Sequence, residues 1–528
     1  MDYKEILKNI EGICGAGSLK AVANGADEVY VEAPAGSFNK LCHAFHKTLN
    51  SPVMMFFAVD NTAGNASYRL YCVFSGAQAC GKWFFVYFDV PENKPEFNSI
   101  AKEIFSASLF EREMKEMFGI IPLGNPDTRR LHLHPEVWPK GNYPLRKSFK
   151  AGSLKAGEKK EYVFGKIEGD GIFEVPVGPV HAGIIGPGHF RFSAAGEPII
   201  NLEIRLGFTH RGVEKLFEGK KPEECLALSE CASGDSVFAH SLAFCGAVEK
   251  INSIDVPPGA QYQRCIFLEL ERMYNHVADM GGIAIDVGFS FPSAYASTMK
   301  ESLLCLNEKL TGSRYLKGIN AIGGTGKSPD KNFLADLSAG LDDITQDFNS
   351  LKEMLLSNVS FMDRADNTGI LRKKTAEDLG VIGMPARASG IPNDLRKDFP
   401  GVYAKMNFKA AKQNKGDVLA RLNVRFQEFE ESISIIRQAM NLLHGDGVPG
   451  NNTGAGKPGF ALGYCEGWRG PVLYWLKINE KGFIDRCKIV DPSFHNWQGL
   501  SYAVLGEIIP DFPLCNKSFD LSYSGNDL

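Results

Sequence analysis

Three long runs in the second half of the chain decide its fold: AHSLAFCGAVEKI (residues 239–251), FLELERMYNHVADMGGIAI (residues 267–285) and DVLARLNVRFQEFEESISIIRQAMNLL (residues 417–443). Apolar residues recur in each run at spacings of three and four, which is the pattern of an amphipathic α-helix. Such helices bury their apolar faces against one another. The spacing therefore predicts a helical bundle over much of the region from about residue 221 to residue 443.

Shorter β-type runs flank these helices. FEVPVGPV (residues 173–180) and HFRFSAAGEPIINLEIRL (residues 189–206) predict paired strands with a hairpin turn at Gly196-Glu197. PVLYWLKI (residues 471–478) predicts a further strand near the end of the chain. The second half should thus combine a helical bundle with small β-sheets.

The beginning of the chain follows a different pattern. Residues 1 to about 120 alternate short β-type runs, such as Trp83–Phe88, with helical segments, and a helix is expected near Lys102 to Met117. Pro, Lys and Gly are then frequent from Asp127 to Lys160, which disfavours long regular elements. The expected fold class is α+β, with a small α+β domain over residues 1–125, an extended linker over 126–162 and a bundle-containing domain over 163–528.

Composition narrows the possible partners. The chain has 528 residues, with 58 Lys and Arg against 62 Asp and Glu, so it lacks the basic field that holds nucleic acid. Twelve unevenly spaced cysteines are typical of reduced, mostly buried thiols rather than of a disulfide scaffold. No signal peptide and no apolar run of about 18 residues is found. We expect a cytoplasmic protein with no transmembrane segment of its own.

Two local motifs imitate ligand sites. Gly326-Lys327-Ser328 resembles the end of a phosphate-binding loop, but Ala321 stands where that pattern needs glycine, so a turn is the better interpretation. His132 and His134 would share one face of a strand, yet no third metal ligand is suggested nearby. A hydrogen-bonded surface pair is the expectation for these two histidines.

The first half of the chain contains a series of motifs that resembles a known protein family. Glu111-Arg112-Glu113, Met117-Phe118-Gly119-Ile120, the string from Asn125 to Arg130 and PLRKSF (residues 144–149) occur in the order typical of the 30-kilodalton subunit of respiratory complex I. From the residues alone, the charges of Glu111–Glu113 would lie on a solvated helix end. The ordered string makes residues 1–125 resemble the 30-kilodalton subunit.

The second half is similar to the 49-kilodalton subunit of complex I and, more closely, to the large subunits of formate hydrogenlyase and other energy-converting [NiFe] hydrogenases. The resemblance extends from about Val175 to the end and rests on phrases such as VGPVHAGIIGPGHFRF (177–192), LEIRLGFTHRGVEKLFE (202–218), LELERMYNH (268–276), ARASGI (386–391) and IIPDFPLCNKSFDLSYSGND (508–527). It implies a hydrogenase large-subunit-like domain over residues 163–528.

The metal ligands that the resemblance implies are missing. In the catalytic relatives two Cys-x-x-Cys pairs hold nickel and iron, and their positions correspond here to Ser233 and Ser236 and to Ser522 and Gly525. Soft metal centres need thiolates, which neither serine nor glycine supplies. Cys231 and Cys515 are close in sequence to the lost positions, but two isolated thiols cannot rebuild a four-thiolate site. We expect no metal in this chain and, since the sequence stops at Leu528, no cleavable maturation tail.

The quinone ligands that the resemblance implies are also altered. The quinone-binding tyrosine of complex I corresponds to Gly234, which has no side chain to donate a hydrogen bond. The second quinone ligand is a histidine of the first hairpin turn, and His181 and His189 flank that turn. Quinone is a possible ligand on this basis, although structural roles are the alternative for both histidines.

Further residues matter for electron and proton transfer. The resemblance places His210 and Arg211 beside a [4Fe-4S] cluster of a separate small subunit, while a second cluster neighbour, a histidine in complex I, corresponds to Ile283. Arg211 could instead pair with Glu214. Glu214 resembles a hydrogenase glutamate on the proton path, and Asp235 is new in the emptied loop, where burial would make it a proton-handling or ligand-binding candidate. Solvent-facing or helix-capping roles are the alternative for both acids.

These inferences lead to one main functional hypothesis. The chain is expected to be the large subunit of a membrane-associated oxidoreductase complex that is complex I-like or related to energy-converting hydrogenases. It would lack a Ni-Fe centre, dock on a small Fe-S subunit and membrane-arm subunits at the cytoplasmic face of the membrane, and couple electron transfer to ion translocation. The alternatives are a quinone-reducing subunit with a rearranged pocket and a non-catalytic structural assembly subunit.

Overall fold

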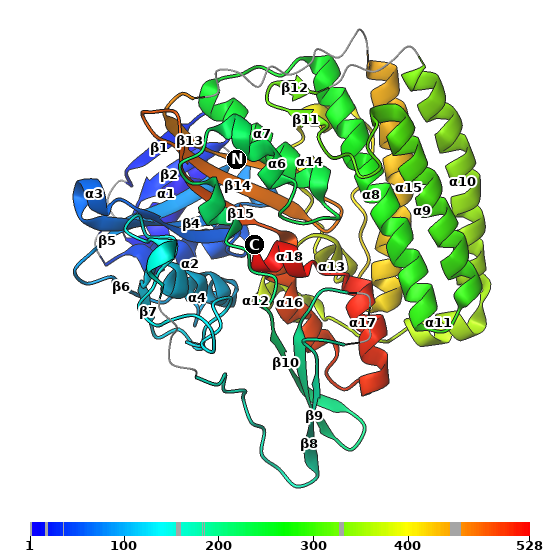
Figure 1. The fold of residues 1–528 in the computed structure, drawn as a ribbon, viewed down its shortest axis with the longest axis horizontal. Helices are drawn as coiled ribbons and strands as arrows, with labels where there is room; N and C mark the ends of the chain where they lie inside the picture. Colours follow the sequence, from blue (N-terminus) through cyan, green and yellow to red (C-terminus); the bar gives the residue numbers. More distant parts are fainter. Residues whose placement is uncertain are drawn as a thin grey trace.

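The computed structural model describes residues 3–15, 19–34, 36–154, 160–181, 183, 185–326, 332–443 and 456–528. Two sets of residues named above lie outside these ranges: Lys327 and Ser328 of the motif that resembles a phosphate-binding loop, and residues 155–159 of the predicted linker. Figure 1 shows the N-terminal sheet on one side, a bundle of long helices on the other, and smaller sheets between and below them. The predicted α+β class, with a central helical bundle and short sheets, is confirmed.

The N-terminal region forms a five-stranded sheet in the order β1-β2-β5-β4-β3, in which β2 and β5 are parallel and the other neighbours antiparallel. Its strands are β1 (Ala21–Asn24), β2 (Glu28–Glu32), β3 (Met55–Asp60), β4 (Ser67–Phe74) and β5 (Trp83–Pro91). Helices α2 (Phe38–Leu49) and α4 (Ser108–Phe118) cover one face, and α1 (Tyr3–Cys14) packs on α2. The helix predicted near Lys102 begins at Ser108. The short elements of this region are α3 (Thr62–Asn65), β6 (Glu96–Asn98) and β7 (Ile121–Leu123).

Two further sheets belong to the second half. Strands β8 (Ile172–Val177), β9 (His189–Ala195) and β10 (Ile199–Arg205) form one antiparallel sheet, and the predicted turn at Gly196 is confirmed. Strands β13 (Gly459–Glu466), β14 (Pro471–Ile478) and β15 (Ile484–Val490) form the other. The short pair β11 (Asn320–Ala321) and β12 (Gly324–Thr325) lies beside helices α7 (Val237–Asn252) and α8 (Pro258–Asp286).

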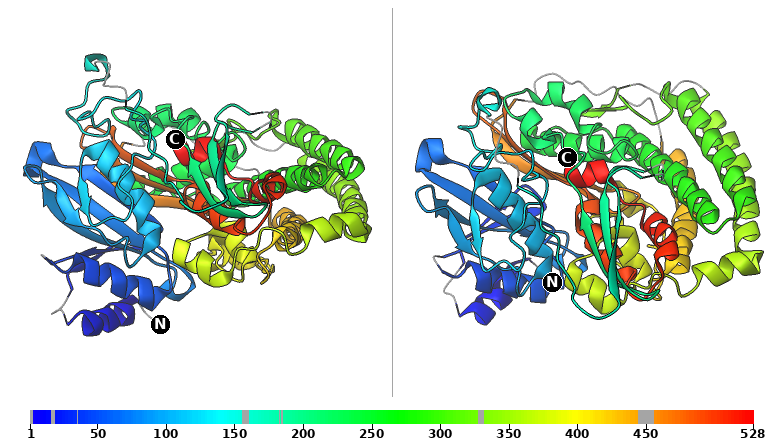
Figure 2. Two further views of the ribbon diagram at one scale, coloured as in Figure 1. Left: turned by 90° about the horizontal axis from the view of Figure 1, so that it is seen from below. Right: turned by 60° about the horizontal axis from the view of Figure 1, so that its bottom comes forward.

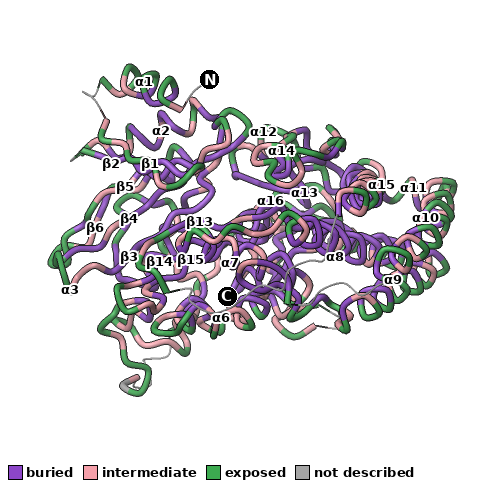
Figure 3. The backbone as a smooth tube through the Cα atoms, turned by 90° about the horizontal axis from the view of Figure 1, so that it is seen from above, coloured by how far each residue is buried: buried purple, intermediate pink, exposed green. Residues whose placement is uncertain are grey.

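The bundle consists of α8 (Pro258–Asp286), α9 (Ser290–Thr311), α10 (Phe333–Ser357) and α15 (Val418–Leu442), as Figure 2 also shows. The run at residues 239–251, which the spacing also predicts to join the bundle, forms α7 and packs mainly on β13 and β14 instead. Helix α8 is buried along most of its length, whereas α9 and α10 expose one face (Figure 3). The remaining helices are α5 (Val213–Phe217), α6 (Pro222–Ser229), α7 (Val237–Asn252), α11 (Val359–Ala365), α12 (Lys373–Leu379), α13 (Gly383–Ala388), α14 (Leu395–Asp398), α16 (Pro492–Ala503), α17 (Phe512–Phe519) and α18 (Tyr523–Asp527).

Both halves contribute to one of the hydrophobic cores of the chain. Trp475 of β14 is fully buried, packs against Phe57 and Tyr71 of the N-terminal sheet, and donates a hydrogen bond from Nε1 to the Tyr30 hydroxyl at 3.0 Å. The face of the N-terminal sheet opposite α2 therefore packs on β13–β15. The boundary near residues 126–162 remains a prediction, although the described part of this segment contains little regular structure, as expected.

The expectation that Glu111, Arg112 and Glu113 lie on a solvated helix end is wrong. All three side chains are buried, and Glu113 lies at the junction of the two halves. The Glu111 carboxylate accepts hydrogen bonds from Ser99 and Ile100, and Glu113 forms an ion pair with Lys488 of β15 at 2.7 Å. The charges tolerate burial because each has a specific partner.

Candidate functional site

The two loops in which the resemblance places the metal thiolates lie against each other. Ser233 precedes α7 and Ser522 precedes α18, yet their Oγ atoms are 2.8 Å apart across 289 residues of sequence. Ser233 is fully buried and donates to Asp235 Oδ1 at 2.7 Å. Ser522 caps α18 by accepting from the backbone N–H of Gly525 at 2.9 Å. The structure thus brings the first and last candidate loops together through hydroxyl contacts.

The other residues of the first loop have different surroundings. Ser236 is buried at the start of α7, and its Oγ accepts a hydrogen bond from Trp468 Nε1 at 3.0 Å. Gly234 is exposed, and a Cβ built at this position would meet no atom within 4 Å. The position of the complex I tyrosine is therefore open on the protein surface.

The residues present do not fit a nickel–iron centre. The Ser233 and Ser522 hydroxyls are used in hydrogen bonds, and a neutral hydroxyl is a poor ligand for a soft metal. Gly525 faces the buried Asp491, and a Cβ at this glycine would lie 2.6 Å from the carboxylate. A cysteine there would need Asp491 to move. Among the described residues, no group of three or more His, Cys, Asp and Glu side chains could hold a metal ion.

Asp235 and Arg469 form the main ion pair of the site. The Asp235 carboxylate accepts from both terminal nitrogens of Arg469, at 2.7 and 2.5 Å. Arg469 is buried, lies 3.9 Å above the ring of Trp468, and also contacts Asp520 at 3.2 Å. The Asp235 side chain is 40% exposed, so the condition of burial on which the sequence hypothesis rested is not met. Both of its oxygens are instead occupied by the guanidinium.

Sequence reasoning missed Arg469. It stands in the tight turn Gly467–Gly470 between β13 and β14, where a single arginine gives no periodic or motif signal. Its role depends on long-range contacts with Asp235 and Asp520, which lie 234 and 51 residues away in sequence. Only the fold reveals them.

Glu214 lies in a second charged cluster. Its carboxylate contacts Arg486 at 2.7 Å and Lys488 at 3.1 Å, and it accepts from the backbone N–H of Ile489. Burial alone would raise the pKa of Glu214, but Arg486 and Lys488 lower it to about 2. Glu214 therefore stays ionised near neutral pH, which does not support proton transfer through it. The solvent-facing alternative is wrong as well, because the side chain is buried.

Arg211 presents its charge at the surface beside both loops. Its terminal nitrogens donate to the carbonyl oxygens of Cys231 at 2.8 Å, Ala232 at 3.1 Å and Ser524 at 3.1 Å. The alternative pairing with Glu214 is not formed, because Glu214 binds Arg486 and Lys488. Arg211 therefore joins the two loops and remains accessible from solvent.

The other residues predicted to lie near the [4Fe-4S] cluster of a small subunit are less accessible to solvent than Arg211. His210 is half-buried: its ring stacks on His132 at 5.6 Å, its Nδ1 is 2.7 Å from the Asp527 carbonyl oxygen, and desolvation lowers its pKa. Ile283 is fully buried in α8. His132 is itself buried against Glu116, and His134 contacts the Leu206 carbonyl, so the expected surface pair of histidines is not found. Of the predicted cluster neighbours, only Arg211 has its charge at the surface.

The two quinone-ligand candidates flank a turn that packs on the site. A Cβ at Gly186 or Gly188 would lie 2.6 to 2.8 Å from the ring of Tyr523, the residue after Ser522. His181 Nδ1 accepts from the Gly183 N–H at 3.1 Å, and His189 Nδ1 is 3.1 Å from the Gly178 carbonyl oxygen. The Nε2 atoms of both histidines are buried without a hydrogen-bond partner among the described residues.

Comparisons with known proteins agree with this architecture. The family model described as "Respiratory-chain NADH dehydrogenase, 30 Kd subunit" matches residues 31–154, and the model described as "Respiratory-chain NADH dehydrogenase, 49 Kd subunit" matches residues 286–458. Among the described helices, none is long and apolar enough to cross a membrane.

Individual relatives extend the match to most of the chain. Formate hydrogenlyase subunit 5 of Escherichia coli (strain K12) is 33% identical over 90% of this chain and 84% of its own length. Hydrogenase-4 component G of the same organism is 32% identical over 90% and 83%, and NADH-quinone oxidoreductase subunit 4 of Thermus thermophilus is 29% identical over 66% and 92%. The chain therefore belongs to the family of complex I 30- and 49-kilodalton subunits and related hydrogenase large subunits, with both complex I domains fused in one polypeptide.

Proposed function

We propose that this chain is the large subunit of a membrane-associated oxidoreductase complex and works without a Ni-Fe centre of its own. The observation that carries the proposal is the contact between Ser233 and Ser522, closed at 2.8 Å, with Arg469 bound to Asp235 beside it. Hydroxyls and an ion pair occupy the positions where relatives need sulfur ligands. The chain would then act through its partners rather than through a resident metal.

Arg211 is the residue proposed to face a small Fe-S subunit. A fixed guanidinium near a [4Fe-4S] cluster favours the reduced cluster electrostatically. The three carbonyl contacts fix its position without neutralising its charge. Electron transfer at that cluster would be coupled to ion translocation in membrane-arm subunits, with this chain peripheral at the cytoplasmic face.

Two other functions have support from particular observations. A non-catalytic assembly subunit is favoured by the hydrogen bonds that fill the site around Ser233 and Ser522. A quinone-reducing subunit is favoured by the buried Nε2 atoms of His181 and His189, which lack a partner among the described residues. Loss of quinone reduction when both histidines are replaced would support the quinone function.

The test is purification of the intact complex from its native host, followed by metal analysis and partner identification. We expect stoichiometric iron without nickel, together with a cluster-bearing small subunit. The variant Arg211→Gln should lower the midpoint potential of that cluster's EPR signal or release the small subunit. Nickel at one atom per chain, or a monomer without partners, would refute the proposal.

A further inference from the structure

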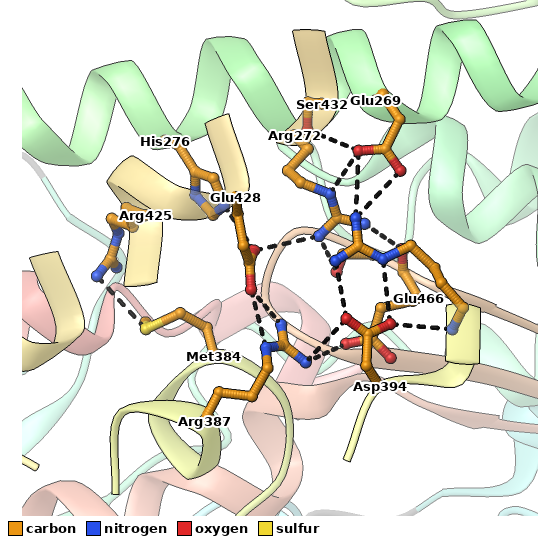
Figure 4. Close-up of polar contacts among 12 residues, drawn as sticks. Glu269, Arg272, His276, Met384, Arg387, Asp394, Arg425, Glu428, Ser432 and Glu466 are labelled. Carbon is orange, nitrogen blue, oxygen red and sulfur yellow. Dashed lines mark hydrogen bonds and ion pairs between the residues drawn. The ribbon is translucent and has the colours of Figure 1, made fainter. Parts of the chain in front are cut away.

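A network of buried charges lies between α8, α13, α15 and β13 (Figure 4). Three buried arginines, Arg272, Arg387 and Arg396, stand among four buried carboxylates: Glu269, Asp394, Glu428 and Glu466. Arg387 contacts Glu466 and Glu428 at 2.7 and 2.8 Å, Arg272 contacts Glu269 at 3.0 Å, and Arg396 contacts Asp394 at 2.8 Å. Each carboxylate thus has a cation, but three cations serve four acids.

The fourth carboxylate is not balanced by histidine. His276 Nε2 lies 2.9 Å from Glu428, but burial lowers the pKa of His276 to about 4, so the ring is neutral near pH 7. With every acid ionised, the three arginines and four carboxylates carry one uncompensated negative charge, and Asp398, a fifth carboxylate in the same cavity wall as Glu466 and Arg396, adds a second. Buried charge without a counter-charge is costly, so the network should attract a proton or a cation.

One edge of the network reaches a large cavity. The cavity has a volume of about 1160 Å³ and is bounded by the β1–β2 turn, α7, the start of α8, the segment after α14, and β13. Glu466 and Arg396 belong to its wall, and so do Asp398 and Tyr403. On the other walls, Lys250 pairs with Asp27 and Arg264 pairs with Glu249, each at 2.6 Å. Those cations are therefore already engaged.

Asp398 is the carboxyl group best placed to receive a proton. Its side chain forms no ion pair with any residue that the structure describes, whereas both oxygens of Glu466 accept hydrogen bonds, from Arg387 and from the Leu395 N–H. Burial, followed by the negative charges of Glu466 and Asp394, raises the pKa of Asp398 to about 7. A proton on Asp398 would therefore break no ion pair in the described part of the chain.

We propose that Asp398, a half-buried carboxylate at the edge of the network, is a proton-binding site that takes up one proton from water in the cavity. Protonation converts the carboxylate to a neutral carboxyl and removes its repulsion with Glu466 and Asp394. Arg387, Asp394 and Arg396 all lie on the same segment, Gly383–Asp398. Proton uptake therefore changes how firmly this segment is held on β13, and it needs no docked partner, so it stands apart from the proposed function.

The experiment is an infrared pH titration of the full chain labelled with [4-¹³C]aspartate, between pH 5 and pH 9. The label separates aspartic from glutamic carboxyl bands. In the parent protein, two aspartic acid C=O bands should disappear with midpoints near 7, because burial also raises the pKa of Asp279 to about 7. Asp398→Asn should remove one of them. The surface variant Asp378→Asn, whose carboxylate pairs with the exposed Lys374, should remove neither.

A second variant keeps the proton-accepting group and changes only its surroundings. Glu466→Gln removes the neighbouring negative charge, so the Asp398 midpoint should fall by about 1 pH unit. A merely structural role would not move this midpoint. Identical bands in the parent and Asp398→Asn, or an unchanged midpoint in Glu466→Gln, would overturn the proposal. If Asp398→Asn does not fold, the Glu466→Gln midpoint decides alone.

Discussion

Replacing Lys488 by Met should remove the buried cation that pairs with Glu113 and Glu214 where the two halves of the chain meet. Lys488 Nζ lies 2.7 Å from both oxygens of Glu113 and 3.1 Å from Glu214, and its side chain is 2% exposed. Glu214 would keep Arg486, but Glu113 has no second ion-pair partner among the described residues. Removing one partner of a buried pair costs about 3 kcal/mol or more. We therefore expect the free energy of unfolding to fall by about 3 kcal/mol near pH 8.

The loss should depend on pH in a defined direction. Burial raises the pKa of Glu113 above its ordinary 4.5 although the Lys488 charge lowers it, so this pKa should rise further when Lys488 is replaced. A carboxyl group whose pKa is higher in the folded than in the unfolded protein lowers the free energy of unfolding little below pH 4.5. It lowers that free energy most at pH values above its folded pKa. The loss of unfolding free energy caused by Lys488→Met should therefore become smaller as the pH falls from 8 towards 5, because Glu113 takes up a proton in the variant. Adding Glu113→Gln should restore part of the stability at pH 8.

Urea denaturation followed by tryptophan fluorescence measures this effect, because Trp475 lies at the junction of the halves. With a slope of about 3 kcal/mol per molar urea, the midpoint should fall by about 1 M. The matched control Lys94→Met removes an exposed lysine paired with Glu96 and should leave the midpoint unchanged. Equal midpoints for the two variants, or a deficit for Lys488→Met that is the same at pH 5 and pH 8, would refute this reasoning.

Three further outcomes are expected. Gly525→Cys should lose about 2 kcal/mol in thermal unfolding because its Cβ meets Asp491 at 2.6 Å, and equilibrium dialysis should detect no nickel bound to it. Gly234→Tyr should change stability by less than about 0.5 kcal/mol, since the position is open; a large loss would contradict the loop geometry. Arg211→Gln should weaken binding of the small Fe-S subunit about tenfold in surface plasmon resonance, and unchanged binding would exclude Arg211 from the interface.

Periodicity predicted the regular elements because each of them buries a continuous face. The run at 267–285 lies within α8, the run at 417–443 coincides with α15, and the strand predicted at 471–478 is β14. The burial of Glu113 could not be predicted in this way, since charged residues are normally exposed and its partner Lys488 lies 375 residues away.

The candidate site was predictable only in part. Ser233 and Ser522 were found by aligning the chain with the two Cys-x-x-Cys pairs of its hydrogenase relatives, and the structure brings these two serines into contact. Asp235 was noticed as a new charge, but its partner Arg469 comes from a turn between strands whose pairing no local pattern specifies. His210 and Arg211 are adjacent in sequence, yet one is half-buried and the other exposed, a difference that periodicity cannot predict outside a regular element.

The hydrogen bond between Trp475 and Tyr30 bears on why relatives of this chain include polypeptides that match 90% of it and others that match 66% of it. The two side chains complete a core to which both halves contribute, so the halves would remain associated even if the peptide backbone between them were cut. The covalent connection then acts mainly as a tether that raises local concentration and ensures equal numbers of the two parts. The single polypeptide thus secures stoichiometry for an interface to which both halves contribute buried side chains.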